Sequence, residues 1–212
     1  MPALCRKILI IILIIIAFAA VLCYGFLMFI NRAPARTIPP GRNIVSPANG
    51  RLIAVTKVDG PDLTFFKDGL KNILAVNELN PPVWILLVEM NLKDVHVQRS
   101  PIDGVISRQQ YFPGKFKNVL TAKNKSELVN LNEKMLTIIK GEGLSVGVIQ
   151  VAGQAARRIK SDVKAGQSVL KGEIFGRITL GSQVVLLLPG NLELKVQAGQ
   201  KVVDGETIVA EY

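Results

Sequence analysis

The sequence predicts a mainly β (α+β) protein: a pseudo-duplicated, barrel-sandwich-like β domain with one or two helices, preceded by an N-terminal transmembrane helix. Three observations predict this architecture. Residues 8–30 form an uncharged apolar run. The rest of the chain consists largely of short segments rich in β-branched residues, separated by glycine turns. Several of these segments recur along the chain, which is typical of a duplicated fold.

The first element is the apolar run. Ile8–Ile30 comprises 23 residues without a charge, and a helix of this length extends about 34 Å, enough to cross a bilayer core. A signal peptide is the alternative, because Arg6 and Lys7 precede the run and Ala17–Ala19 resembles a cleavage site. The apolar core of a signal peptide is normally only about 7–15 residues long. We therefore expect an uncleaved membrane anchor over residues 1–30.

A linker over residues 31–43, rich in Pro, Gly and Arg, follows the anchor and leads into one domain over residues 44–212. Within the domain, β-branched segments predict strands at Ile44–Val58, Val83–Met90, Val95–Ser107, Leu144–Val151, Ser168–Leu180, Val184–Leu188 and Thr207–Ala210. One helix is expected around Ala152–Lys160. The polar, Lys-rich stretch Phe112–Asn132 is expected to be a mobile loop.

The strand-turn segments recur in pairs. Val163–Glu173 and Val196–Glu206 share seven of eleven residues, and Ser46–Gly50 resembles Ser100–Gly104. Repeated strand-turn-strand units favour a pseudo-symmetric β-sandwich or a flattened barrel. The repeated pattern AGQxVxxGE is also typical of biotinyl and lipoyl carrier domains. The lysine-bearing tripeptides that those carriers present in an exposed turn do not occur in this sequence.

The formal net charge of +10 restricts the class of partner. Lys and Arg are spread without a long basic run or interleaved aromatic residues, which argues against nucleic acid and favours an anionic membrane surface. Arg6 and Lys7 precede the apolar run, and Arg32, Arg36 and Arg42 follow it. The larger number of basic residues after the run favours a cytoplasmic location for the domain. The protein would then be a single-pass protein of the cell membrane, or a peripheral one with an N-terminal anchor. Both cysteines lie in the anchor region, so no disulfide framework is expected.

Six blocks of sequence, in this order, resemble the short prokaryotic phosphatidylserine decarboxylases, a family of self-processing proenzymes that use a pyruvoyl group. The blocks are RAPAR (32–36), SPANG (46–50), DVHVQRSPIDG (94–104), NEK (132–134), QVAGQAARRI (150–159) and FGRI (175–178) followed by GS (181–182). The family patterns that they resemble are RDPxR, SPADG, DVHVNRxPxDG, NER, QIAGxxARRI and FGxIxxGS. The resemblance extends from Asn31 to Ala210.

The resemblance implies a role for Ser182. Its hydroxyl would attack the carbonyl of Gly181, and β-elimination would leave a β chain (1–181) and an α chain (182–212) headed by a pyruvoyl group. The substrate amine would form a Schiff base with the pyruvoyl ketone, which takes up the electrons released with CO₂. The implied reaction converts phosphatidylserine, or an archaetidylserine-like lipid, to phosphatidylethanolamine in phospholipid biosynthesis, with no metal and no pyridoxal phosphate.

The same blocks suggest four further site residues. His96 is the only histidine, and an imidazole that titrates near neutrality can protonate the carbanion formed after CO₂ loss or assist self-cleavage. Arg99 lies where the long bacterial relatives carry a second histidine. It cannot act as a base but is suited to binding the substrate carboxylate or phosphate. Arg157 and Arg158 are candidates for the lipid phosphate, although one of them could instead cap a helix C-terminus.

Asn49 departs from the family, which has an aspartate at this position of the self-cleavage machinery. An amide can hold geometry by hydrogen bonding but cannot stabilise a developing positive charge. We therefore expect slower self-cleavage, or none. Deamidation at Asn49-Gly50, or Asp103 in the equivalent place of the second repeat, could supply the missing acid.

The leading hypothesis is thus a membrane-anchored lyase. Its partners would be the aminophospholipid substrate, the anionic membrane and the two chains of an α/β heterodimer, with further oligomerisation left open. One alternative is a non-catalytic homologue that binds aminophospholipid, motivated by Asn49. The other is a membrane-tethered barrel-sandwich adaptor, motivated by the repeats, but such adaptors need long helical hairpins for which this sequence has no room.

Overall fold

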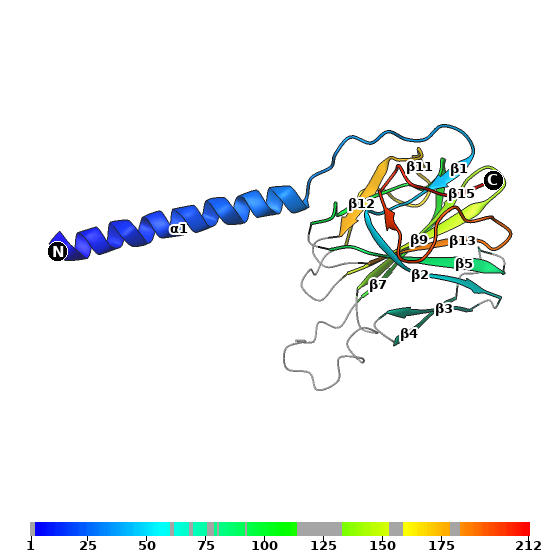
Figure 1. Ribbon diagram of the computed structural model, residues 1–212, viewed down its shortest axis with the longest axis horizontal. Coiled ribbons are helices and arrows are strands. Elements are labelled where there is room, and N and C mark those ends of the chain that lie inside the picture. Colours follow the sequence, from blue (N-terminus) through cyan, green and yellow to red (C-terminus); the bar gives the residue numbers. More distant parts are fainter. Residues whose placement is uncertain are drawn as a thin grey trace.

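The computed structural model describes residues 3–59, 62–67, 70–75, 79, 81–91, 93–113, 133–152, 159–178 and 183–212. Helix α1 (Ala3–Ile30) projects away from a β domain (Figure 1). Its segment Cys5–Ile30 is long and apolar enough to cross a membrane, judged by length and composition. Side chains are exposed from Cys5 to Phe29, and Ile30 is fully buried at the junction with the domain. The helix is therefore consistent with the predicted anchor.

The described residues of the domain are organised mainly as strands. These strands are β1 (Asn43–Val45), β2 (Gly50–Val58), β3 (Asp62–Lys67), β4 (Leu70–Ala75), β5 (Val83–Glu89), β6 (Val97–Arg99), β7 (Gly104–Phe112), β8 (Lys134–Lys140), β9 (Ser145–Val151), β10 (Ile159–Ser161), β11 (Ser168–Val169), β12 (Ile174–Ile178), β13 (Gln183–Pro189), β14 (Lys201–Val202) and β15 (Ile208–Glu211). The prediction of a mainly β protein with an N-terminal helix is confirmed.

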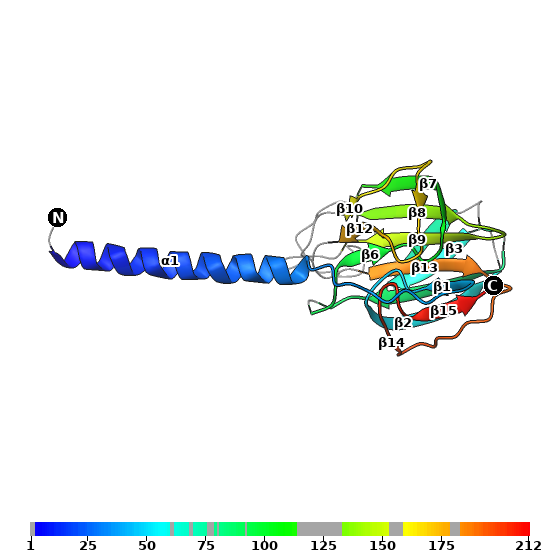
Figure 2. The ribbon, with the colours of Figure 1, turned by 90° about the horizontal axis from the view of Figure 1, so that it is seen from above.

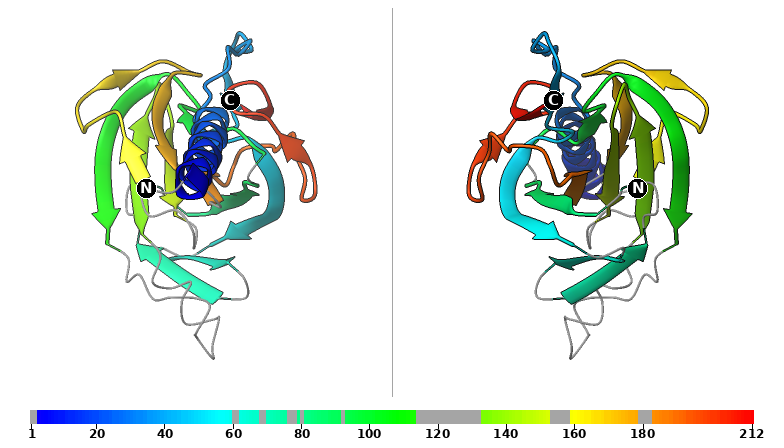
Figure 3. Two further views of the ribbon diagram at one scale, coloured as in Figure 1. Left: turned by 90° about the vertical axis from the view of Figure 1, so that its left-hand side faces the viewer. Right: turned by 90° about the vertical axis from the view of Figure 1, so that its right-hand side faces the viewer.

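Eight strands form one curled sheet in the order β11-β7-β8-β9-β13-β5-β2-β14. Figure 3 shows this sheet curving from β7 (green) on one side to β2 (cyan) on the other, as a half-barrel. Two smaller sheets, β1-β15 and β10-β12-β6, are separate from it, as is the β3-β4 hairpin. Figure 2 shows α1 at one end of the domain and the C-terminus at the other.

The curled sheet is buried on both of its faces. Along β13, Leu186 and Leu188 belong to one apolar cluster, whereas Val185 and Leu187 belong to a second. Because successive side chains of a strand point to opposite faces, each cluster covers one face of the sheet. The first cluster also contains Ile44 of β1 and residues of β12 and β15, so the small sheets pack on that face.

The strand order reveals a complete duplication. In one half, β2-β5-β13 is flanked by β14 on β2 and accompanied by the β1-β15 pair; in the other, β7-β8-β9 is flanked by β11 on β7 and accompanied by the β6-β12 pair. The β13-β9 pairing joins the halves. The second half lies in the chain between β5 and β13 of the first. The register shifts at Leu52/Ala54 in β2 and at Ile106/Arg108 in β7 occupy equivalent positions.

The two long sequence repeats build the same turn in each half. Gly166 N–H donates to the carbonyl of Ile106 at 2.8 Å, and Gly199 N–H donates to the carbonyl of Leu52 at 2.6 Å. Both glycines have a positive φ, +88° and +89°, which glycine adopts without the steric penalty of a side chain. The predicted repetition therefore corresponds to a structural repeat.

Several predicted segments divide into two strands. Ile44–Val58 forms β1 and β2, Val95–Ser107 contains β6 and the start of β7, and Ser168–Leu180 contains β11 and β12. Strands β3, β4, β8, β10 and β14 are not among the predicted ones. They comprise the β3-β4 hairpin, the two short strands β10 and β14, and β8, which follows a stretch predicted as loop.

The helix predicted around Ala152–Lys160 is wrong at its C-terminal end. Ile159 and Lys160 belong to β10, where they pair with Ile178 and Arg177 of β12. Residues 153–158 lie outside the described residues, as does most of the predicted loop Phe112–Asn132. Pairing with β12 satisfies the backbone of 159–161, and a helix there would lose these ladder hydrogen bonds.

The predicted linker lies on the domain. Ile38 packs over Gly172, where an added Cβ would overlap the Ile38 side chain, and its Cδ1 would lie 3.1 Å from a Cβ at Gly205. These glycines are the second ones of the two repeats, and their N–H groups donate to Ser100 and Ser46 carbonyls at 2.8 Å. A side chain at Gly172 would therefore clash with the linker, and one at Gly205 would crowd both Arg99 Cδ, at 2.9 Å, and Ile38.

Replacing Gly172 by alanine is expected to destabilise the domain more than replacing Gly166. Both residues have positive φ, so both variants incur the left-handed backbone penalty of about 1–2 kcal/mol. Only Gly172 also faces Ile38, whereas nothing lies within 4 Å of a Cβ at Gly166. The additional overpacking loss should be about 1–3 kcal/mol in the free energy of unfolding, measured by chemical denaturation. Equal losses in the two variants would show that the linker is not packed there.

Candidate functional site

One end of the curled sheet carries a row of residues in register, which we call the site end. Its members, on neighbouring strands, are Arg51, Glu89, Gln183, Val151 and Lys134. Gln183 begins β13, and Ile178 ends β12. Gly181 and Ser182 fall between them and lie outside the described residues. Ile178 and Gln183 are thus the described residues nearest to Gly181-Ser182 in sequence, and Gln183 is itself a member of the row.

His96 belongs to the same end of the molecule. Its carbonyl accepts a hydrogen bond from Ile178 N–H at 3.0 Å, so the histidine backbone is attached to the last residue of β12. The residue is 1% exposed. Its Nδ1 lies 2.8 Å from the backbone carbonyl oxygen of Asp94. A carbonyl can only accept, so Nδ1 carries the proton and donates.

This hydrogen bond determines the state of the other ring nitrogen. With the proton on Nδ1, Nε2 of His96 carries a lone pair in the neutral imidazole. Nε2 is buried and has no hydrogen-bond partner among the described residues. Burial lowers the pKa of His96; the carbonyl and charge of Asp94 oppose the shift, and the Arg32 charge adds to it. His96 is therefore a neutral histidine with an available acceptor at neutral pH.

The lowered pKa of His96 predicts a dependence of stability on pH. The unfolded imidazole has a pKa near 6.5, and the folded one has a lower value. Below pH 6.5 the unfolded chain therefore binds more protons at this residue, so folding stability decreases as the pH falls towards the folded pKa. The slope due to this one group is at most about 1.4 kcal/mol per pH unit.

This dependence can be measured by denaturant unfolding between pH 5 and 8, comparing the parent with His96→Asn. The difference between the two curves isolates the histidine from carboxylates that titrate in the same range. The stability difference should be constant above about pH 7 and change below it, because the unfolded pKa is near 6.5. A difference that stays constant throughout would contradict the assignment of a lowered pKa.

Two glutamines that sequence reasoning did not select hold the histidine backbone. Gln98 Nε2 donates to the His96 carbonyl at 3.0 Å, and Gln150 Nε2 donates to Gln98 Oε1 at 2.7 Å. Both side chains are fully buried. A Cβ at Gly176 would lie 3.0 Å from Gln150 Nε2, so this glycine provides room for the amide. The available signal is a polar residue inside an apolar strand segment, as Gln150 is in β9.

Gln150 leaves one acceptor free at the centre of this network. Its Oε1 is buried and has no hydrogen-bond partner among the described residues. An unpaired buried acceptor costs about 1–3 kcal/mol, which a ligand or neighbouring donor can relieve. His96 Nε2 and Gln183 Oε1 are likewise buried without a partner among the described residues. These three acceptors suit a group that donates hydrogen bonds, such as an amine or a hydroxyl.

Arg99 has partners within the chain. Its Nε binds Asp204 Oδ2 at 2.9 Å, Nη1 donates to the Gly172 carbonyl at 2.8 Å, and Nη2 donates to the Pro34 carbonyl at 2.7 Å. The residue is 8% exposed. These contacts favour a structural role, and the predicted contact with a substrate carboxylate or phosphate stays a prediction. Arg157 and Arg158 lie outside the described residues.

Asn49 and Asp103 lie at opposite ends of the sheet. Asn49 is half-buried and directly precedes Gly50 at the start of β2, beside the Arg51–Glu89 pair of the site end. Asp103 precedes β7, which starts beside Lys140, and its carboxylate accepts the backbone N–H of Lys171 at 2.8 Å. The seven residues of β13 separate the ends by about 20 Å. The duplication thus places equivalent turns at opposite ends, which argues against Asp103 as a replacement for the missing acid at the site end.

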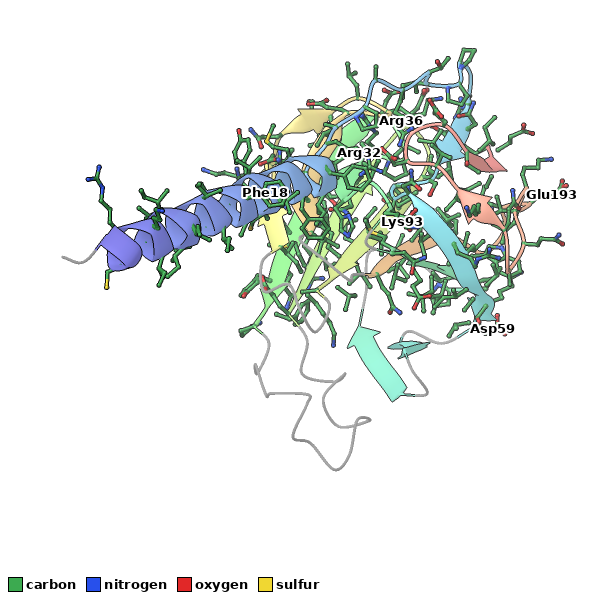
Figure 4. The ribbon with its side chains drawn as sticks, turned by 60° about the vertical axis from the view of Figure 1, so that its left-hand side comes forward. Phe18, Arg32, Arg36, Asp59, Lys93 and Glu193 are labelled. Carbon is green, nitrogen blue, oxygen red and sulfur yellow. The ribbon has the colours of Figure 1, made fainter. Side chains whose placement is uncertain are left out.

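The site end faces α1. Arg32, just beyond the helix, donates to the carbonyls of Phe29 at 2.7 Å and Lys93 at 2.6 Å, and its guanidinium lies 4.0 Å from the Phe29 ring centroid. Figure 4 shows Arg32 and Lys93 where the helix meets the domain, with Glu193 on the far side. Lys93 lies three residues before His96, so the histidine is near the end of the domain from which the helix projects.

Comparison with known proteins gives one consistent answer. The family model described as phosphatidylserine decarboxylase matches residues 24–210. A phosphatidylserine decarboxylase proenzyme of Novosphingobium aromaticivorans is 40% identical over 194 residues, covering 91% of this chain and 74% of the relative. One of Gluconacetobacter diazotrophicus is 36% identical, covering 91% and 79%. A putative archaetidylserine decarboxylase proenzyme of Methanocaldococcus jannaschii is 34% identical, covering 87% and 89%.

Proposed function

The chain belongs to the phosphatidylserine decarboxylase family, and we propose that it is a pyruvoyl-dependent carboxy-lyase that first cuts itself between Gly181 and Ser182. The products are a β chain (1–181) and an α chain (182–212), which stay together as a heterodimer. The observation that carries the proposal is His96, a neutral buried imidazole whose Nε2 has no hydrogen-bond partner among the described residues. Its backbone is joined to the strand that precedes Gly181.

Self-cleavage is balanced by atoms already in the chain and one water. The Ser182 hydroxyl oxygen bonds to the Gly181 carbonyl carbon, its proton passes to a base, and the C–N bond breaks with protonation of the nitrogen, leaving an ester. Removal of the α-proton of residue 182 then breaks the Cβ–O bond and releases the Gly181 carboxylate. Water hydrolyses the remaining enamine, in its imine form, to the ketone and ammonia. Nε2 of His96 is the acceptor that we assign to these proton transfers.

The same residues fit the finished enzyme. The pyruvoyl group supplies an electron sink for the electrons released with CO₂. His96, once protonated on Nε2, can return a proton to the carbon that loses CO₂, and burial keeps its pKa low enough for this transfer. The unpaired Gln150 Oε1 is suited to accept a hydrogen bond from the substrate amine. We assign the lipid phosphate to Arg157 and Arg158, since Arg99 already binds Asp204.

The placement of the site supports a lipid substrate. The site end faces α1, so an α1 that spans the membrane brings this end to the bilayer surface. We propose that residues 1–30 are the anchor, 31–43 the linker and 44–212 the catalytic domain. The substrate is phosphatidylserine or an archaetidylserine-like aminophospholipid. The basic chain, at +10, favours an anionic leaflet, and the arginines after α1 favour a cytoplasmic domain.

Intact-mass analysis of the purified full chain tests this proposal. We expect a C-terminal fragment of 31 residues, counted from position 182 to 212, lighter by one ammonia than a serine-headed peptide. The fragment should react with a carbonyl reagent such as phenylhydrazine. A single uncut chain that does not react would support the alternative, a non-catalytic homologue that binds aminophospholipid. Family membership favours both of these functions over the transport adaptor.

The observation that favours the alternative is Asn49 at the site end. Asn49→Asp is expected to accelerate self-cleavage by at least about tenfold, a lower limit set under the usual 10²–10⁴-fold contribution of a positioned acid or base. Asp103→Asn serves as the matched control, because Asp103 lies at the opposite end of the sheet and should leave the rate unchanged. Cleavage is followed by gel electrophoresis after synthesis of the chain. An unchanged rate in Asn49→Asp would remove Asn49 from the self-cleavage machinery.

A further inference from the structure

The linker is held by a buried carboxylate. Arg36 Nη2 lies 2.5 Å from Asp204 Oδ1, and Arg99 Nε lies 2.9 Å from Asp204 Oδ2. The Asp204 side chain is fully buried, and the two arginine side chains are 13% and 10% exposed. Arg36 belongs to the linker and Arg99 to β6, so one carboxylate joins the linker to the domain. We call these three residues the linker clamp.

Neighbouring contacts extend the clamp along the linker. Arg99 Nη2 donates to the Pro34 carbonyl at 2.7 Å, and Thr37 N–H donates to Glu206 Oε1 at 2.9 Å. Ile38 then packs over Gly172 and Gly205. Pro34, Arg36, Thr37 and Ile38 therefore each contact the domain.

The duplication provides a second attachment. Lys171 occupies the position in its repeat that Asp204 occupies in the other. Its Nζ donates to the Gly41 carbonyl at 2.8 Å and lies 2.9 Å from Asn43 Oδ1. The same turn position in the two halves thus binds the middle of the linker through a carboxylate and its C-terminal end through an ammonium.

These contacts remove the freedom that a linker normally has. A flexible chain of the 12 residues between Ile30 and Asn43 has an end-to-end distance of about 20 Å and no preferred direction. On such a tether the domain could turn its site end away from the bilayer. With Ile30 buried and Arg32 bound to Lys93, the clamped linker instead holds the site end towards α1.

We infer that Asp204, with Arg36 and Arg99, is a positioning residue for membrane-bound substrate: the linker clamp holds the site end at the bilayer surface, where the lipid headgroup reaches His96 without leaving the membrane. The inference rests on the proposed function. It assigns to Arg99 a role in orienting the domain. It also predicts that the clamp affects the rate of decarboxylation of lipid in a bilayer but not that of a substrate that arrives from solution.

Arg36→Ala in the full chain tests the inference, because it opens the linker side of the clamp and keeps the Arg99–Asp204 pair. Arg42→Ala is the matched control: it removes the same charge from the same linker, but Arg42 contacts Glu142 and Tyr212 and not Asp204. Decarboxylation is measured on long-chain phosphatidylserine in the vesicle that holds the enzyme, and on a water-soluble short-chain phosphatidylserine.

Arg36→Ala should lower the rate on vesicle lipid about tenfold, as expected when a held geometry becomes one of many orientations. Its rate on the short-chain substrate and its self-cleavage should stay within about twofold of the parent, and Arg42→Ala should resemble the parent on both substrates. Parallel losses on both substrates would show a clamp that only stabilises the site, and no loss on either would show that orientation is not limiting. Either result overturns the inference.

A second measurement does not depend on activity. A fluorophore is attached at Lys93→Cys or at Glu193→Cys, in a chain whose Cys5 and Cys23 are replaced by serine, and vesicle headgroups carry a nitroxide quencher. Position 93 should be quenched much more strongly than position 193, which lies on the far side (Figure 4). Arg36→Ala should reduce this difference. If Arg36→Ala reduces the difference in quenching while the parent lacks decarboxylase activity, the proposed function fails and the positioning role stands. If Arg36→Ala leaves the difference in quenching unchanged, the positioning role is overturned.

Discussion

Ser182→Ala is expected to leave the full chain uncut and without decarboxylase activity. Alanine has no hydroxyl to attack the Gly181 carbonyl, so no ester forms and no pyruvoyl group arises. The expected loss of activity is complete within the range of the assay, because the group that accepts the electrons released with CO₂ is never made. Intact mass would show one chain of 212 residues and no reaction with a carbonyl reagent.

Ser182→Cys is the control for this prediction. A thiol is a nucleophile of similar size, so this variant should recover part of the cleavage. The uncut Ser182→Ala chain should unfold at the same denaturant concentration as the uncut fraction of Ser182→Cys, which shows that the alanine variant folds. Cleavage of the alanine variant at the same bond would mean that another group attacks Gly181 and that the proposed mechanism is wrong.

His96→Ala is expected to lower the rate of decarboxylation by about 10²–10⁴-fold, the usual contribution of a positioned acid or base. The reason is Nε2 of His96, which has no hydrogen-bond partner in the described part of the chain and belongs to the only histidine of the sequence. The rate should be measured per cut chain, because His96 also serves self-cleavage in our proposal. A parent pH profile that falls on the acid side, with a midpoint below pH 6.5, would follow from the lowered pKa of His96.

Asp94→Ala distinguishes the contribution of the His96 imidazole from that of the Asp94 carboxylate. The backbone carbonyl of Asp94, not its side chain, accepts the Nδ1 hydrogen bond at 2.8 Å, so this variant keeps the tautomer. Its rate should fall much less than that of His96→Ala, since the ring keeps its proton on Nδ1 and loses only the Asp94 charge that raises its pKa. Equal losses in Asp94→Ala and His96→Ala would point to the carboxylate as the working group.

Local patterns were sufficient for the strands that lie in apolar, β-branched runs. Val184–Leu188 is predicted as a strand and forms the centre of β13, because every residue there is buried on one face or the other. β10 could not be predicted in this way. Ile159–Ser161 becomes extended because β12 offers it a pairing edge, and no local pattern reports a pairing partner from another part of the chain.

The site residues likewise divide into those that local sequence indicates and those that depend on tertiary contacts. His96 and Ser182 were selected because their residue types carry the chemistry and their surrounding blocks match the family. Gln98 and Gln150 were not selected, because an amide acquires its role only from the neighbours it bonds. Arg99 was assigned to substrate by its residue type, whereas its nearest charged partner, Asp204, lies 105 residues away in sequence.

The sequence by itself determined the apolar N-terminal helix, the mainly β character, the duplication and the family, because composition, periodicity and motif order are properties of neighbouring residues. Tertiary structure alone decided the protonation state of His96, the separation of Asn49 from Asp103 and the attachment of the linker to Asp204. Each of these depends on burial or on contacts between residues far apart in the chain. Desolvation and ion pairing arise only when folding brings such groups together.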